Sequence, residues 1–250
     1  MDVAVLPKVL RPYRADELVR LGSSADGGYV VDLAAVDASK FLLSCGVNED
    51  WSFEEDFYAR NRVPILALDG SVGESYFKDQ VRRAFSRPWR LFWHWRVYRS
   101  YIRFYSGERQ HQQVFVGNTL PNSRSLMDIV GDAISEQRRP FYIKMDVEGS
   151  EYEILDEVLA LSGDLSGLIV EFHAVDQKLD HIVEFVQKLP LRLCHVHVNN
   201  NGGVTKDNIP TVIECTFSRF CSSEKSDAVL PLPLDKANWH KLPDFELRFH

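Results

Sequence analysis

Apolar runs of strand length alternate with stretches of helical spacing along nearly the whole chain. In "FYIKMDVEGSEYEIL" (141–155), an apolar run ends in acids, and apolar residues then recur at helical spacing. Five such units precede two closing apolar runs. Strands that alternate with helices build parallel sheets, so the pattern predicts an α/β fold.

The last two predicted strands, 191–200 and 210–218, are joined by a connection too short for a helical crossover, so they should pair antiparallel. Ser52 and Glu55 have the spacing of a capping box that starts the helix after the first strand. We expect a mostly parallel seven-stranded sheet with helices on both faces and an antiparallel C-terminal hairpin. The other five strands are predicted at 41–46, 63–70, 112–118, 141–147 and 165–175.

Composition narrows the class of protein. With 250 residues, 45% of them hydrophobic, the chain can form a single domain spanning 1–250, with a helical insertion at about 75–107. The net charge of −7 argues against a nucleic-acid partner. The four cysteines form no CxxC pair, which favours reduced thiols. No signal-peptide pattern or bilayer-length apolar run is present, so we expect a cytoplasmic protein.

Residues 81–105 differ from the rest of the chain. They contain seven arginines, nine aromatic residues and no acid, so the remaining chain carries a net charge of −14. Three interpretations stay open: a lid that recognises a phosphorylated or nucleotide-linked sugar, an interfacial helix on an anionic membrane, and a packing surface in a homo-oligomer.

The predicted strand ends point to a ligand site. In a parallel sheet they would bring Gly46, Asp69, Asn118, Asp146 and Glu171 to one edge, where open α/β sheets bind ligands. Gly46 permits a close backbone turn, and the acid at 69 has the spacing that suits a nucleoside ribose. The three-glycine dinucleotide fingerprint is absent, which disfavours a nicotinamide-dependent oxidoreductase.

Ionisable side chains cluster towards the later strands. Asp146, Glu171 and His173 form an oxygen-rich set with one imidazole, which suits Mg²⁺ or Mn²⁺, or a general base for an alcohol. His195 and His197 share one strand face, as catalytic groups or as buried core histidines. The alternative for the acid at 146 and its neighbour Glu148 is that they cap the following helix.

The segment "IKMDVEGSEYEIL" resembles the signature of FkbM-type methyltransferases. The flanking pieces "SCGVNEDWSFEEDF", "LALDG", "LIVEFH" and "PTVIECTFS" are similar to the same family, and the resemblance covers roughly Arg20 to Phe217. It implies a Rossmann-like class I methyltransferase fold and S-adenosyl-L-methionine as cofactor. It also implies O-methylation of a small-molecule acceptor: a hydroxyl of a sugar, nucleotide-sugar or related metabolite.

The same resemblance assigns residues. It places Asp69 on the ribose and Asp146 and Glu171 where catechol-type enzymes hold Mg²⁺, so these two acids with His173 are candidates for a metal site or for catalysis. His195 is a further catalytic candidate. The cofactor turn would be built from Ser44, Cys45, Gly46 and Val47, with Asp146 beside it. The glycine pattern is poorer than is usual for class I enzymes, so contacts to the methionine part are expected from Asn48, Glu49, Arg20 or Asp26.

Two other functions remain in competition. A nucleotide-sugar glycosyltransferase places a DxD-like pair of acids after an apolar strand, and "MDVEG" imitates that arrangement. A methyltransferase fold that binds its ligand without catalysis is the other alternative. The helix directly after "MDVEG" and the C-terminal hairpin favour the methyltransferase.

Overall fold

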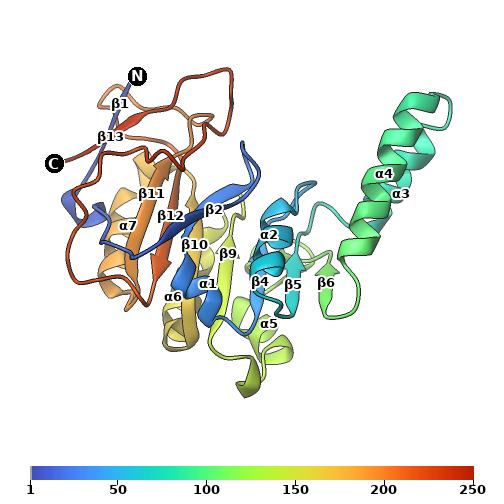
Figure 1. The fold of residues 1–250 in the computed structure, drawn as a ribbon, viewed down its shortest axis with the longest axis horizontal. Coiled ribbons are helices and arrows are strands. Elements are labelled where there is room, and N and C mark those ends of the chain that lie inside the picture. The colour runs from blue at the N-terminus through green and yellow to red at the C-terminus, as the bar shows by residue number, and fades with distance from the viewer. Residues whose placement is uncertain (1) are drawn as a thin grey trace.

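The computed structural model describes residues 2–250. Its centre is one seven-stranded sheet in the order β6-β5-β4-β9-β10-β12-β11 (Figure 1). In that order the strands are β6 (Arg109–Gln112), β5 (Ile65–Leu68), β4 (Leu42–Cys45), β9 (Phe141–Met145), β10 (Leu165–Phe172), β12 (Ile213–Ser218) and β11 (Arg192–Val198). Every pair is parallel except those of β12, which runs antiparallel to both neighbours. The predicted Rossmann-like α/β fold, with a mostly parallel seven-stranded sheet and an antiparallel C-terminal hairpin, is confirmed.

The strand order reverses beside β4. The chain passes from β4 to β5 and β6 on one side and then returns to β9 on the other. Such a switch point leaves a crevice at the carboxyl ends of the two flanking strands, where open α/β sheets bind ligands. The topology therefore selects the ends of β4 and β9 as the place to look for a site.

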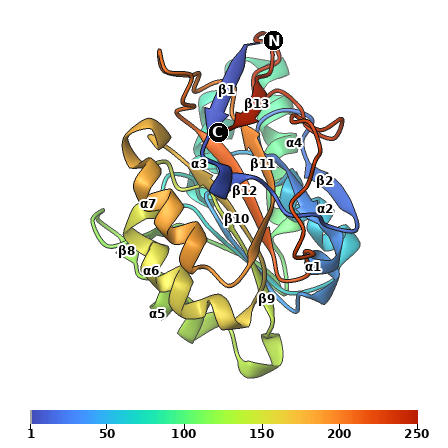
Figure 2. The ribbon, with the colours of Figure 1, turned by 90° about the vertical axis from the view of Figure 1, so that its left-hand side faces the viewer.

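Helices cover both faces of the sheet, as predicted (Figure 2). On one face lie α5 (Leu126–Ala133), α6 (Glu151–Leu161) and α7 (Val175–Lys188). Their buried residues Val130, Ile154, Val158 and Ile182 belong to one apolar cluster with the strands, because their helical spacing places them on one side of each helix. The other face carries α1 (Leu33–Ala38) and α2 (Ser52–Arg60).

A β-hairpin completes this second face. It consists of β2 (Leu18–Gly22) and β3 (Gly28–Asp32), and the Thr216 hydroxyl of β12 donates a hydrogen bond of 2.7 Å to the Val30 carbonyl. The hairpin brings Tyr29 from the N-terminal segment over the sheet. The remaining elements are β1 (Val3–Leu6), β13 (Glu246–Phe249), β7 (Phe115–Val116), β8 (Ser123–Arg124) and the 3-10 helices Lys8–Leu10, Glu136–Arg138 and Ser162–Asp164.

The third strand was predicted at 112–118, and this placement is wrong. The sheet strand is β6, at Arg109–Gln112, while Phe115–Val116 pairs with β8 in a separate two-stranded sheet. β6 is an edge strand of the sheet, with one neighbouring strand and one exposed side, so a polar sequence is tolerated there. Asn118 consequently does not end a sheet strand, and its amide donates instead to Glu153, at 3.0 Å.

The capping box predicted at Ser52 is also wrong. Ser52 is the first residue of α2, and its hydroxyl has no partner among the described residues. Its amide donates to Asp50 at 2.9 Å, and Glu55 accepts from the Trp51 indole at 3.1 Å. Asp50, in the loop before the helix, therefore accepts the hydrogen bond from an amide at the helix start, a role that the sequence pattern assigned to the Ser52 side chain.

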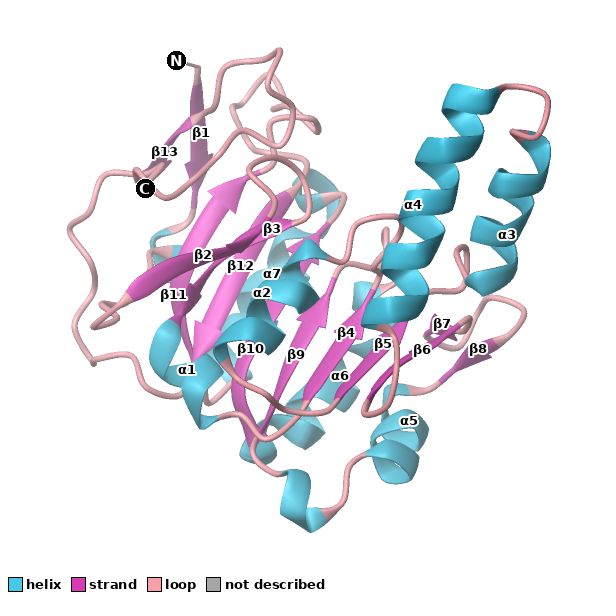
Figure 3. Ribbon diagram, turned by 45° about the vertical axis from the view of Figure 1, so that its right-hand side comes forward, coloured by secondary structure: helices cyan, strands magenta, loops and turns pink. Residues whose placement is uncertain are grey.

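The predicted helical insertion forms a helical hairpin of α3 (Glu74–Arg83) and α4 (Pro88–Phe104) between β5 and β6. It projects beyond the carboxyl edge of the sheet (Figure 3). The four cysteines are free and buried, in agreement with reduced thiols. Within residues 2–250, no helix is both long and apolar enough to cross a bilayer.

Gly46 allows the ends of β4 and β9 to meet, and this contact can be tested. Its φ is +77°, and a Cβ there would lie 1.5 Å from the Asp146 carbonyl oxygen. We expect Gly46→Ala to lower the free energy of unfolding by about 2–5 kcal/mol, through overlap and backbone strain. Chemical denaturation measures the change.

The matched control is Gly131→Ala in α5, where nothing lies within 4 Å of an added Cβ. Because alanine is the better helix former, this variant should gain about 0.5–1 kcal/mol. An equal stability of the two variants would contradict the close approach.

Candidate functional site

A cavity of about 660 Å³ lies at the switch point. Its walls include Gly46 and Val47 after β4, Asp69 after β5, and Lys144 and Asp146 from the end of β9. The volume falls in the range of small-molecule sites, and the location is the one that the topology selects. The cavity is the candidate active site.

The predicted cofactor turn divides into two parts. Gly46 and Val47 line the cavity, whereas Ser44 and Cys45 are completely buried behind it. The Ser44 hydroxyl donates to the buried carboxylate of Glu54, and burial raises the pKa of Cys45 to about 12. These two residues support the floor of the site and do not face a ligand.

Asp69 joins the loops that follow β4 and β5. One carboxylate oxygen accepts from the amides of Val47 at 3.1 Å and Asn48 at 2.7 Å, and the other accepts from the Ser71 and Val72 amides at 2.8 and 3.0 Å. Burial alone would raise the pKa of Asp69, but hydrogen bonds lower it, first the one from the Ser71 hydroxyl at 2.6 Å and then those from the amides of Asn48, Val72 and Ser71. A ribose hydroxyl placed here would donate to a carboxylate that already accepts hydrogen bonds from backbone amides.

The other expected cofactor contacts also separate. Asn48, Glu49 and Asp26 line the cavity. The Arg20 guanidinium lies outside the lining and donates to the carbonyls of Ser23 and Ala25 at 2.9 and 2.8 Å. Arg20 therefore shapes the loop that presents Asp26.

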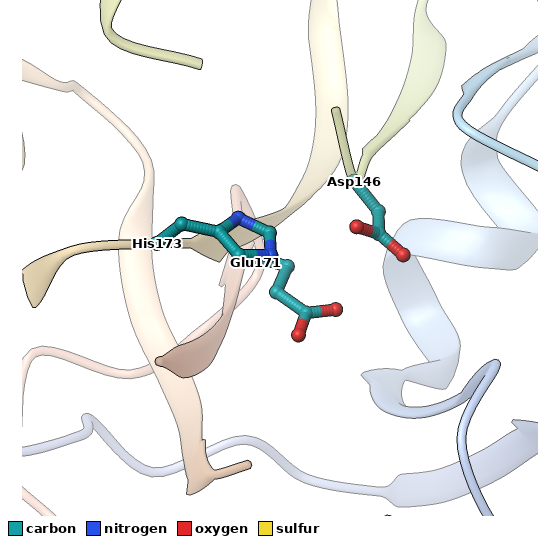
Figure 4. Close-up of side chains that lie close together, drawn as sticks. All are labelled: Asp146, Glu171 and His173. Carbon is teal, nitrogen blue, oxygen red and sulfur yellow. The ribbon is translucent and has the colours of Figure 1, made fainter. Parts of the chain in front are cut away.

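The structure brings Asp146, Glu171 and His173 together. Potential ligand atoms of the three lie within 4.8 Å of one another (Figure 4). Tyr29 donates to Asp146 at 3.0 Å, and the Asn199 amide donates to Glu171 at 2.7 Å. Of the three clustered residues, Asp146 lines the cavity, while the other two lie outside its lining.

Burial and crowding change the protonation of this cluster. The pKa of Glu171 is well above its ordinary value because the carboxyl is buried and faces Asp146 and Glu214. Burial also raises the pKa of Asp146, against the opposing effect of Lys144. Burial would lower the pKa of His173, but Glu151 raises it above the ordinary value. Paired acids with raised pKa values are suited to proton transfer near neutral pH.

Lys144 is a site residue that the sequence reasoning missed. It interrupts the apolar strand β9, is almost fully buried, and donates to the Gly46 carbonyl. Burial would lower its pKa, but Glu54, Asp146 and Glu171 raise it. A lysine inside an otherwise apolar strand was the available signal, because a buried charge is costly unless it is paired.

The histidines of β11 are not part of this site. His195 pairs with Asp235 at 3.1 Å and lines a different cavity, so the structure does not bring it to Asp146. His197 pairs with Glu214 at 3.3 Å and Asp244 at 3.0 Å. Burial would lower the pKa of His197, but these carboxylates raise it to about 10. These contacts favour the interpretation of both as core histidines.

Neither acid after β9 caps α6. Ser150 occupies the N-cap position, and the amide of Gly149 donates to Glu151 at 2.9 Å. The Glu148 carboxylate lies 3.5 Å from His173 and is largely exposed, while Asp146 bonds to Tyr29. The capping alternative is therefore wrong for both residues.

No family model and no curated protein matches this sequence, so the FkbM resemblance stays a hypothesis. Among solved structures, the chain is similar to an rRNA methylase from Streptococcus thermophilus, with 12% identity, a TM-score of 0.39, and coverage of 74% of this chain and 91% of that one. It is also similar to a precorrin-6y C5,15-methyltransferase from Geobacter metallireducens GS-15, with 13% identity, a TM-score of 0.38, and coverage of 75% and 84%. These scores assign no activity to this chain.

The crowded carboxylates generate a stability prediction. Folding raises the pKa of Glu171 above its value of about 4.3 in the unfolded chain. The folded state therefore holds this proton more tightly than the unfolded chain does. The resulting stabilisation is complete at low pH and is lost as the pH rises from about 4.3 towards the folded pKa. We expect Glu171→Gln to raise the free energy of unfolding at neutral pH by roughly 0.5–2 kcal/mol, the usual gain from relieving a strained site. Urea denaturation in chelator-containing buffer measures this gain.

Glutamine keeps an oxygen that can accept from Asn199, so the change isolates the charge. The matched control is Glu153→Gln on α6, whose carboxylate is exposed and accepts from Asn118 and Thr119. These hydrogen bonds lower the pKa of Glu153, so removing its negative charge should lower the free energy of unfolding slightly. Destabilisation by Glu171→Gln would show that the buried carboxylate is ionised and paired.

Proposed function

We propose that this protein is an S-adenosyl-L-methionine-dependent methyltransferase that transfers a methyl group to a hydroxyl of a sugar or related small metabolite. One observation carries the proposal: the cavity at the β4–β9 switch point is lined by acids at the place where this strand order binds its ligand.

The charge of the lining supports a cationic ligand. Six carboxylates face the cavity with one lysine: Asp26, Glu49, Asp50, Asp69, Asp146, Glu148 and Lys144. S-adenosyl-L-methionine carries a sulfonium and an ammonium group, which such a lining attracts. The anionic diphosphate of a nucleotide-sugar would be repelled, so the lining weighs against the glycosyltransferase alternative.

The residues present fit the cofactor. The loop after β4 approaches the site without a side chain at Gly46, and Asp69 holds the amides of Val47 and Asn48 in place at its edge. Asp26 and Glu49 would hold the methionine ammonium, and the carboxylate at 69 would meet the ribose. The cofactor supplies an activated methyl group on its sulfonium.

Asp146 is the proposed proton acceptor. It is the member of the acidic cluster that lines the cavity, and its raised pKa strengthens it as a base. Tyr29 orients its carboxylate through the 3.0 Å hydrogen bond, and carboxylate oxygens of Asp146 and Glu171 lie within 4.8 Å of each other. As the acceptor hydroxyl loses its proton to Asp146, its oxygen becomes the nucleophile.

A divalent ion is the alternative way to activate the hydroxyl. Mg²⁺ or Mn²⁺ held by Asp146, Glu171 and His173 would lower the hydroxyl pKa. A ligating imidazole must be neutral, whereas contacts with Glu151 and Glu148 favour protonated His173. We therefore favour the direct base.

Calorimetry with S-adenosylhomocysteine tests the donor site. We expect stoichiometric binding that Asp26→Asn weakens about tenfold, since one carboxylate contact with the ammonium is lost. Exposed Asp207→Asn is the control and should bind normally. Binding of a nucleoside diphosphate, with no binding of S-adenosylhomocysteine, would overturn the proposal.

Methyl transfer to a panel of sugars and related hydroxyl compounds tests the assignment of Asp146 as the base. We expect Asp146→Asn to lower kcat about 10²–10⁴-fold while S-adenosylhomocysteine affinity changes only a few-fold, because proton transfer is lost and the donor loops persist. Release of S-adenosylhomocysteine measures the rate.

Exhaustive chelation separates the two ways of activating the hydroxyl. Under the base assignment, the wild-type rate survives chelation. If chelation abolishes the rate and added Mg²⁺ restores it, a metal ion and not a direct base activates the hydroxyl. Donor binding without turnover on any acceptor would instead indicate a non-catalytic methyltransferase fold.

A further inference from the structure

The α3–α4 hairpin carries exposed aromatic side chains at its far end. Exposed fractions are 80% for Phe85, 70% for Trp89, 59% for Phe92 and 55% for Trp93. Large apolar side chains gathered on a soluble surface usually mark a contact with another surface. We call these four residues the aromatic tip.

Three residues of the aromatic tip lie in the first turns of α4, and Phe85 lies in the turn between α3 and α4. Trp89, Phe92 and Trp93 recur at i, i+3 and i+4, which places them on one helical face. Tyr101 and Phe104, the buried residues of α4, instead lie in its last turn, near the root of the hairpin. The tip therefore does not contribute to the core that holds the hairpin.

The root of the hairpin is firmly packed against the body. Trp51, just before α2, contacts Phe77 and Tyr101 with ring centroids 5.8 and 5.7 Å apart. From this root α4 runs for 17 residues, a length of about 25 Å. The hairpin is thus an anchored arm that projects from the edge of the sheet carrying the cavity (Figure 3).

Arginines surround the aromatic tip, and most lack an acidic partner. Of the seven in 81–105, Arg82 alone forms an ion pair in the described part of the chain, with Asp79. Arg90 and Arg96 stack over Trp89 and Phe92 at 5.0 and 5.8 Å. Positive charge is thereby concentrated around exposed indole and phenyl rings.

We propose that the α3–α4 hairpin docks the protein on an anionic phospholipid membrane, with the aromatic tip in the headgroup region and the arginines on lipid phosphates. Tryptophan and phenylalanine favour the membrane interface, and nearby arginines gain electrostatic attraction from anionic lipid. The body carries −14 without these arginines, so it is repelled while the arm is attracted. Charge complementarity thus commits the arm, not the body, to the bilayer.

Two other interpretations of the segment fit less well. A lid over the ligand is disfavoured because, among residues 2–250, those lining the cavity lie outside 74–108. A symmetric dimer through the tip would bring the unpaired arginines of two copies together, and like charges repel.

Vesicle co-sedimentation of the full chain tests the proposal. We expect binding to phosphatidylcholine vesicles that contain phosphatidylserine, and little binding to phosphatidylcholine alone. Arg90→Glu with Arg96→Glu should weaken binding at least about 25-fold, roughly fivefold for each arginine lost. Raising the salt concentration should release the wild type.

A second variant isolates the aromatic contribution. Trp89→Ser, Phe92→Ser and Trp93→Ser together should weaken binding by at least about tenfold, because the apolar area that enters the interface is lost. Far-UV circular dichroism checks that each variant keeps its helices.

Matched controls keep the test specific. Lys40→Glu with Lys206→Glu changes the net charge equally, at exposed sites away from the arm, and should bind as the wild type does. Phe220→Ser, Val229→Ser and Leu242→Ser remove exposed apolar groups elsewhere and should also bind normally.

Several results would overturn the proposal. These are absence of vesicle binding at low salt, equal losses in the controls, and a vesicle-free dimer that the aromatic substitutions abolish. Binding of single-stranded RNA in preference to the vesicles would reassign the arm to nucleic acid. The assay reads binding and not turnover, so it stands apart from the proposed methyl transfer.

Discussion

The buried charge of Lys144 is the interaction on which both sides of the cavity depend. Its ammonium group donates to the carbonyl of Gly46 on the β4 side. Glu54, Asp146 and Glu171 surround it and raise its pKa. A buried lysine without such partners would lose its proton or destabilise the fold, and the acids without the lysine would repel one another. One cation therefore fixes the loop after β4 and keeps the acidic cluster compact.

The parts of the fold that the sequence predicts are those governed by local pattern. Apolar strand runs and helical spacing are local properties, so six of the seven sheet strands, the antiparallel C-terminal pair and the helical insertion follow from them. Glu171 and Asp146 could be paired in advance, because the carboxyl ends of neighbouring parallel strands meet at one edge. The polar edge strand β6 escaped this reasoning, since a strand with one exposed side needs no apolar run.

The missed site residues depend on contacts between distant segments. Tyr29 is 117 positions from Asp146 in the sequence, and it reaches that carboxylate because the β2–β3 hairpin folds over the sheet. Nothing in "DGGYVVDL" specifies the strand on which this hairpin will pack. Ser44 shows the reverse case: its place after an apolar strand suits a ligand contact, but its side chain turns inward to Glu54. Which face a strand-end residue presents depends on packing that the motif does not encode.

The charges of the chain are segregated in space, and this separation has a physical consequence. Acids line the cavity, while the unpaired arginines lie on the arm that projects from the same edge of the sheet. Had the arginines entered the cavity, they would have neutralised the carboxylates that can attract a cation, and Asp146 would lose its raised pKa. At physiological salt, exposed charges are screened beyond about 8 Å, and α4 alone is about 25 Å long. The length of the arm thus lets one chain present a strongly basic surface without altering the protonation of its acidic site.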